Sequence, residues 1–236
     1  MKEFQISDAA ANEENIVYLY EALGGAANDF GGTVIAGTDS ARSVLTLKFP
    51  SAYYDYMRSE AEDKIADVIA VRYKYRFFTE RIKAAGLSPF ENEILFSALI
   101  AADIDEDRRY IMRRLKTFKN YALDGIYNFR LAPLKRKWEE VAGYIPPYFP
   151  PSRLTDFVSY LTGEKSGRRV TVENGKVYDK HYNILHRTRL TGEMKEGRIL
   201  REVILSGCGD IRLLTPVPPC DEKYLKEYFS GRITFS

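Results

Sequence analysis

The spacing of hydrophobic residues predicts a chain that is mainly helical, with strands near both ends. Over residues 12–23, Ile16, Leu19, Tyr20 and Leu23 fall on one face of a helix, and Gly24-Gly25 is expected to end it. Two short runs rich in strand-forming residues, 33–36 and 44–49, flank a turn with hairpin composition. The first fifty residues therefore predict a small α/β region.

A longer helical region follows. Ser51 is a plausible N-cap for its first helix, and the segment Ser88-Pro89-Phe90-Glu91 has the pattern of a capping box with proline at the first helical position. The apolar periodicity and the breaks predict successive helices over residues 50–85, 89–102, 105–120 and 132–143.

Four prolines at residues 146–151 mark the clearest interruption, because proline cannot continue a helix. A helix over 152–161 is expected next, and then a β-hairpin around Asn174-Gly175. The remaining pattern predicts a helix over 194–205, a strand over 210–217, a helix over 221–229 and a strand over 232–235.

These elements predict a mostly helical α+β fold. It has an N-terminal α/β hairpin region, a central helical bundle and a small C-terminal α/β layer. We expect two domains, a mostly helical one over residues 1–150 and an α/β one over 151–236.

Composition limits the kinds of partner and the cellular compartment that we expect for the protein. The 236 residues carry a net charge of only +2, so any binding of nucleic acid must depend on a local patch. Two cysteines are too few for a disulfide framework, and the N-terminus has no apolar signal segment. No apolar stretch is long enough to span a membrane. We expect a cytoplasmic protein.

The most unusual chemistry lies between residues 105 and 137. Between Arg108 and Lys137 only Asp124 is acidic, and the cations there share the segment with several tyrosines. Helical spacing places Arg109, Arg113 and Lys116 on one face. Such a surface could hold phosphates and stack bases, or it could be a solvated helix face. The candidate binding residues are Arg108, Arg109, Arg113, Arg114, Lys116, Lys119 and Tyr127.

Arg130 belongs to a different environment, because Phe129 and Leu131 flank it in an apolar segment. We expect it to be partly buried and paired with an acid as a structural residue.

The sequence contains no complete catalytic constellation. His181 with His186, and Cys208 with Cys220, lack the spacing of metal-ligand pairs. Cys208 lies between glycines with some expected exposure, where a turn role is favoured over a nucleophile. We therefore expect no catalytic residue, no metal and no cofactor.

Several stretches in the second half of the chain follow a known family pattern in order. The first is the segment Asp124-Gly125-Ile126-Tyr127-Asn128-Phe129-Arg130-Leu131. The later ones are 156–161, the hairpin at 172–179, the helix and strand around 204–214 and the ending at 229–233. Together they resemble the YtxC-like family of sporulation proteins of endospore-forming bacteria. The resemblance covers residues 105–236, and the proline run departs from the continuous helix expected in that family.

The resemblance implies a sporulation-associated bacterial protein without an assigned activity, so we expect a binding role with a protein partner rather than catalysis. The alternative that rests on the residues themselves is a nucleic-acid-binding module that uses the basic stretch 108–137.

Overall fold

The computed structural model describes residues 1–164, 167–192 and 194–235. It is 57% helical and 18% strand, which confirms the mostly helical α+β class. The α-helices are α1 (Glu13–Asp29), α2 (Tyr54–Asp67), α3 (Lys74–Arg81), α4 (Pro89–Leu115), α5 (Leu123–Arg130), α6 (Ala132–Gly143), α7 (Pro151–Gly163), α8 (Arg198–Leu205) and α9 (Pro219–Tyr228). The strands are β1 (Lys2–Ala9), β2 (Thr33–Thr38), β3 (Arg42–Phe49), β4 (Tyr121–Ala122), β5 (Arg169–Glu173), β6 (Lys176–Tyr178), β7 (Asp210–Leu213) and β8 (Ile233–Phe235).

Contacts divide the chain into two compact units that are each discontinuous in sequence. The first comprises Met1–Tyr73 and Asp105–Lys137, and the second comprises Lys74–Ile104 and Trp138–Ser236. This division differs from the predicted domains 1–150 and 151–236, although residues 151–236 all belong to the second unit. The proline run that suggested the boundary is a local signal, whereas the units arise from contacts between distant segments.

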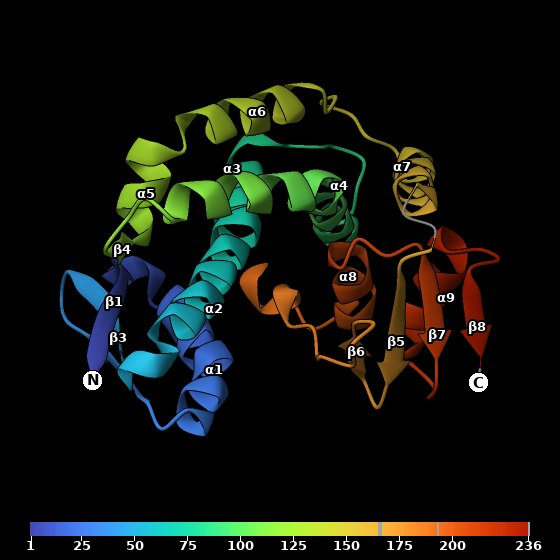
Figure 1. Ribbon diagram of the computed structural model, residues 1–236. Helices are drawn as coiled ribbons and strands as arrows, with labels where there is room; N and C mark the ends of the chain where they lie inside the picture. The colour runs from blue at the N-terminus through green and yellow to red at the C-terminus, as the bar shows by residue number, and fades with distance from the viewer. Residues whose placement is uncertain (165–166, 193, 236) are drawn as a thin grey trace. The chain divides into compact units, whose positions relative to one another are not determined.

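The first unit is built on a four-stranded sheet with the order β2-β3-β1-β4. Strand β1 pairs antiparallel with β3 from Lys2↔Phe49 to Ala9↔Arg42, and parallel with the short β4. Helix α1 packs on the sheet, as Figure 1 shows, and buries Ile16, Leu19 and Leu23. The expected hairpin of β2 and β3 is confirmed.

A buried polar network links β1 to the helices of the first unit. Helix α2 continues into a π-helix, Val68–Tyr73, and the Tyr73 hydroxyl donates to both carboxylate oxygens of Asp8 at 2.9 Å. Asn15 Nδ2 donates to Asp8 Oδ2 at 2.7 Å. A buried carboxylate needs such donors, so the network anchors the end of the π-helix to the sheet.

The second unit contains the other sheet, with the order β6-β5-β7-β8. Strands β5, β7 and β8 are parallel, and β6 is antiparallel to β5. Asn174 and Gly175 connect the hairpin with φ angles of 49° and 71°, as a type I′ turn requires. The predicted order of two strands, helix, strand, helix and strand is confirmed (Figure 1).

Several predicted helix boundaries are wrong. The helical regions expected over 50–85 and 105–120 end at Arg81 and Leu115, and the helix expected over 194–205 begins at Arg198. Helix α1 continues through Gly24-Gly25 to Asp29, and Ala27 is buried on the same face as Leu23. Each glycine costs a helix about 1 kcal/mol, which burial of the apolar face against the sheet offsets. Ser51 lies in a 3₁₀ turn, and no side chain caps α2.

The interruption predicted near residue 103 is confirmed. Asp103 has non-helical angles, with φ −130° and ψ 19°, inside α4. The capping box at the start of this helix is also present: Ser88 N donates to Glu91 Oε2 at 2.8 Å, and Glu91 N donates to Ser88 Oγ at 3.2 Å. The part of α4 after Asp103 belongs to the first unit and carries the cations described next.

Candidate functional site

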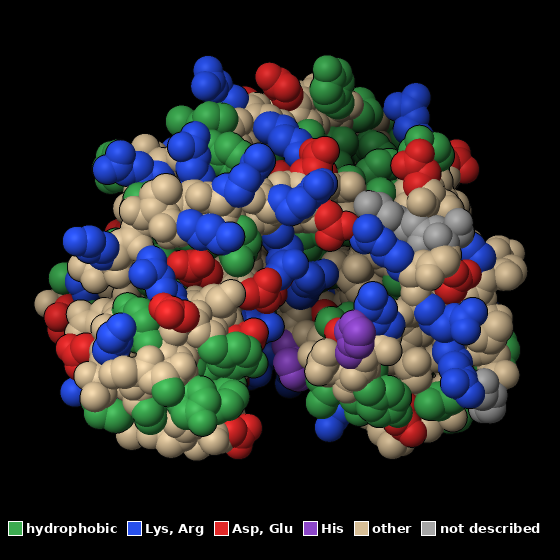
Figure 2. Space-filling view, in the orientation of Figure 1, with side chains coloured by type: hydrophobic (Ala, Val, Ile, Leu, Met, Phe, Trp, Pro, Cys, Tyr) green, Lys and Arg blue, Asp and Glu red, His purple; other side chains and the backbone are tan. Residues whose placement is uncertain are grey.

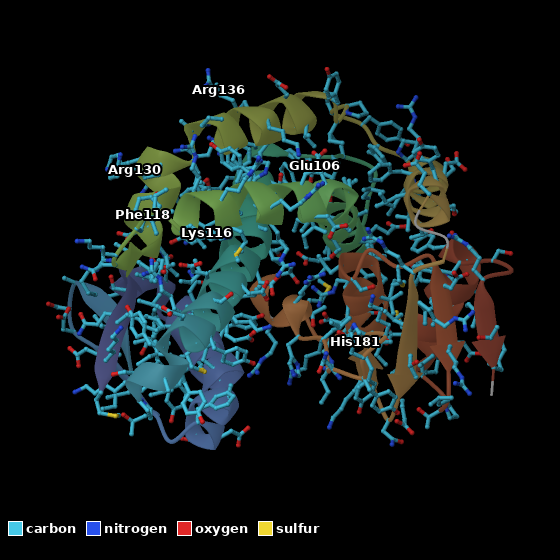
Figure 3. All side chains as sticks on the ribbon, in the orientation of Figure 1. Glu106, Lys116, Phe118, Arg130, Arg136 and His181 are labelled. Carbon is cyan, nitrogen blue, oxygen red and sulfur yellow. The ribbon has the colours of Figure 1, made fainter. Side chains whose placement is uncertain are left out.

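A basic surface lies on the 105–137 segment of the first unit. Ile111 and Leu115 are buried, so the opposite side of α4 faces solvent and exposes Arg109 and Arg113, and Lys116 is exposed in the turn that follows the helix. Figure 2 shows Lys and Arg side chains gathered over this region, and Figure 3 shows Lys116 just after α4, Arg130 on α5 and Arg136 on α6. We define the basic surface as the exposed cations Arg109, Arg113, Arg114, Lys116, Lys119, Arg130 and Arg136.

The cations of the basic surface are not neutralised by acids. No ion pair joins any of them to an acid in the part of the chain that the structure describes. Asp124, the acid within the stretch, pairs with Arg42 of β3 at 2.8 Å instead. The positive charge of the basic surface is therefore open to a ligand.

Some of these cations contact neighbouring groups without losing their charge. Arg109 Nε donates to the backbone oxygen of Asp105 at 3.2 Å, one turn earlier on the same helix. The Arg114 guanidinium lies 5.4 Å from the centre of the Tyr110 ring. Both contacts orient the side chain and leave donors free for an anion.

Arg108 is the predicted binding residue that lies on the other side of the helix. Its side chain is 23% exposed and forms ion pairs with Asp63 at 2.6 Å and Asp67 at 2.9 Å. Burial lowers the pKa of Arg108, but the charges of Asp67 and Asp63 outweigh it and the net shift is upward. Arg108 joins α4 to α2 and is not part of the basic surface.

Tyr127, the aromatic residue among the predicted binding residues, already packs against other side chains. Its ring packs against Tyr73 with 4.5 Å between the ring centres, and the Lys135 ammonium lies 5.1 Å from the Tyr127 ring centre. Tyr127 is half-buried, so it contributes to packing within the first unit.

The expectation that Arg130 is partly buried is wrong. Helix α5 buries Leu123 and Ile126. Arg130 is four residues after Ile126, so helical spacing places it near this buried face, yet the residue is exposed in the last turn of α5. Figure 3 shows its side chain projecting outward from α5. A cation there also suits the negative end of the helix dipole.

Two exposed residues of the segment were not among the candidates. Phe129 is 81% exposed, and Arg136 is exposed on α6. No clear signal for Phe129 was present in the sequence, because it is three residues after the buried Ile126 and lies in an apolar segment, which suggested burial.

Cys208 in the second unit is not the partly exposed residue that its flanking glycines suggested. It is buried, and burial raises the pKa of its thiol to about 11. Its Sγ lies 3.6 Å from the backbone oxygen of Val203. A protonated, enclosed thiol at neutral pH fits a structural residue.

A shallow pocket of about 210 Å³ lies in the second unit, between the β5–β6 hairpin and α8. It is lined in part by His186, Arg198 and Glu202. The Glu202 carboxylate already accepts hydrogen bonds from the backbone of Arg187 and Thr188, each at 2.8 Å. Within the described residues, no group of three His, Cys, Asp or Glu side chains is placed to hold a metal ion.

Comparisons of the chain with protein-family models, with curated proteins and with solved structures found no match. Among the described residues, no helix has the length and apolar character needed to cross a membrane.

Proposed function

We propose that the protein binds nucleic acid through the basic surface. The observation that supports this most is the group of exposed cations on α4, α5 and α6 that have no acidic partner among the described residues. Phosphate groups are recognised by such clusters, because each Lys or Arg that contacts the backbone releases a bound counterion.

The arrangement of charges on α4 supports a binding role over a purely structural one. Arg109 and Arg113 are four residues apart on α4, so their like charges face each other along the helix, and Lys116 follows in the turn after Leu115. A like-charged pair at this spacing destabilises a helix by about 0.2–0.5 kcal/mol. The helix dipole favours Arg113 in the last turn, but Arg109 lies outside that turn. A helix face shaped only by stability would place acids between these cations.

The first unit uses its acids elsewhere. Asp63 and Asp67 pair with Arg108, Glu106 and Asp107 pair with Lys137, and Asp124 pairs with Arg42. The exposed cations are therefore a local concentration of positive charge in a chain whose net charge is only +2. An acidic protein is the competing type of partner for the same surface.

The resemblance to the YtxC-like family extends the proposal. On that basis the binding takes place in an endospore-forming bacterium during sporulation. The support is the ordered resemblance over residues 105–236, and expression of the gene equally in growth and sporulation would remove it.

The test is binding of fluorescent single-stranded and duplex DNA and RNA, followed by anisotropy at low salt. Arg109→Glu/Arg113→Glu/Lys116→Glu should weaken binding by roughly tenfold or more, because three phosphate contacts become repulsive. The matched control is Lys180→Glu/Lys195→Glu/Lys223→Glu, which makes the same charge change at exposed positions of the second unit.

The control variant should retain most of the affinity. Equal losses in the two variants would mean that overall charge drives binding, and the basic surface would lose its role. No binding of any probe by the wild-type protein would reject the proposal, and an acidic protein partner would then be the reading to pursue.

A further inference from the structure

The exposed ring of Phe129 sits within the basic surface. Phe129 is 81% exposed and lies in the last turn of α5, directly before Arg130. Phenylalanine has no polar atom to interact with water, so full exposure of its ring leaves apolar area unburied. Nothing in the packing of α5 requires an aromatic residue at this position, since Leu123 and Ile126 provide its buried face.

Several cations lie near Phe129 along the chain. Lys135 of α6 donates from Nζ to the backbone oxygen of Asn128 at 3.2 Å, which holds the first turns of α6 next to the last turn of α5. Arg136 follows on α6 and is exposed. Phe129 therefore lies next to Arg130 in the chain, at the end of α5 that Lys135 of α6 contacts.

The other aromatic rings of residues 105–137 are engaged or enclosed. Tyr127 packs on Tyr73, Tyr121 is buried, and the Tyr110 ring lies under Arg114. Phe118 is half-buried. Within this fully described segment Phe129 is the aromatic side chain that is available to a ligand.

We propose that the ligand is single-stranded nucleic acid, with Phe129 stacking on one base while the neighbouring cations hold the phosphates. This inference rests on the proposed function and narrows the substrate class. A single strand exposes the faces of its bases, whereas a duplex hides them in its stack. A phenyl ring forms no hydrogen bonds with the edges of bases, so its stacking favours single strands without favouring a particular sequence.

The first test compares oligodeoxythymidylate of about 15 nucleotides with a duplex of the same length. The wild-type protein should prefer the single strand, and Phe129→Ala should weaken single-strand binding between about fivefold and about 150-fold, the range for loss of one stacked base. Duplex binding should change little. Tyr144→Ala is the matched control, because it removes a ring that is 84% exposed in the second unit.

A second variant reports stacking directly. The chain has one tryptophan, Trp138, which is buried. Phe129→Trp adds an exposed indole, and stacking on a base should quench its fluorescence when the oligodeoxythymidylate is added. Polyphosphate supplies charge without bases and should leave that fluorescence unquenched. A wild-type titration corrects for Trp138, and circular dichroism checks that each variant is folded.

The outcomes separate this inference from the function on which it rests. Binding that needs Arg109, Arg113 and Lys116 but is unaffected by Phe129→Ala would overturn the stacking role alone. Preference for the duplex, or quenching by polyphosphate, would do the same. Absence of binding to both nucleic acids would overturn the proposed function and this inference together.

Discussion

Arg108 and Arg109 are adjacent in sequence and have opposite environments. Arg108 is enclosed and paired with Asp63 and Asp67 of α2, whereas Arg109 is exposed and has no acidic partner among the described residues. The 3.6-residue period of α4 accounts for the difference, because neighbouring residues on a helix point about 100° apart.

The comparison shows that one run of cations serves two purposes. On the inner side of α4, Asp107 and Arg108 link the helix to α6 and α2 through ion pairs. On the outer side, the cations make no such links to any residue that the structure describes, and they are open to a ligand. We therefore expect substitutions on the inner side to change stability, and substitutions on the outer side to change binding.

The largest effect on stability is expected from Arg108→Ala. Removal of the guanidinium takes away a cation that lies 2.9 Å from the carboxylate of Asp67, whose side chain is 8% exposed. Stranding one partner of a buried pair costs about 3–5 kcal/mol, and we expect the lower end because Arg108 is 23% exposed. Urea denaturation followed by circular dichroism measures the free energy of unfolding.

The geometry of the Arg108–Asp67 pair also explains why the expected loss of stability lies at the lower end of that range. Arg108 Nε and Asp67 Oδ1 are 2.9 Å apart, but the N–H is not aligned for a hydrogen bond, so the contact is mainly electrostatic. The matched control is Arg109→Ala, which should stay within about 0.5 kcal/mol of the wild type. Equal midpoints for the two variants would contradict the division of α4 into inner and outer sides.

A smaller loss of stability is expected from Lys137→Ala. Lys137 Nζ lies 3.1 Å from Asp107 Oδ1, and the Asp107 side chain is fully buried. Lys137 is itself 35% exposed, so water screens the pair and we expect a loss of about 1–2 kcal/mol.

Glu106→Ala provides the comparison for Lys137→Ala, since this exposed carboxylate lies 2.9 Å from the same ammonium group. It should cost less than about 0.5 kcal/mol. If thermal melts show the Glu106 variant to be the less stable of the two, burial of Asp107 does not determine the strength of the pair.

The smallest effect on stability is expected from Arg130→Ala. Arg130 is exposed at the end of α5 and has no ion pair with a described residue. Its substitution should therefore change the free energy of unfolding by less than about 0.5 kcal/mol. Its loss should nevertheless weaken nucleic-acid binding, because it belongs to the basic surface. A fall in the melting temperature of several degrees, with binding intact, would restore the structural role that its apolar neighbours suggested.

Local signals in the sequence predicted much of the fold. The capping box at Ser88 and the Asn174-Gly175 hairpin depend on a few adjacent residues, and both are present. Strand β1 was missed, although Phe4 and Ile6 alternate with polar residues, because its pairing with β3 joins segments about forty residues apart. The discontinuous units could not be predicted for the same reason.

The candidate site was predicted in part. Helical periodicity correctly placed Arg109 and Arg113 on one exposed face, whereas Lys116 is exposed in the turn after the helix. It could not show that Asp63, on another helix, would pair with Arg108 and withdraw it from that face. Phe129 was assumed to be enclosed because hydrophobic residues are usually buried, and its exposure became visible only with the orientation of α5.

The salt dependence of single-strand binding tests the central claim most directly. Affinity for oligodeoxythymidylate is measured at several salt concentrations for the wild-type protein and for Arg109→Glu/Arg113→Glu/Lys116→Glu. If these three cations contact phosphates, the slope of log affinity against log salt should be shallower in the variant by about 2, at roughly 0.7 per contact. Equal slopes for the two proteins would contradict the assignment of the basic surface as the nucleic-acid-binding site.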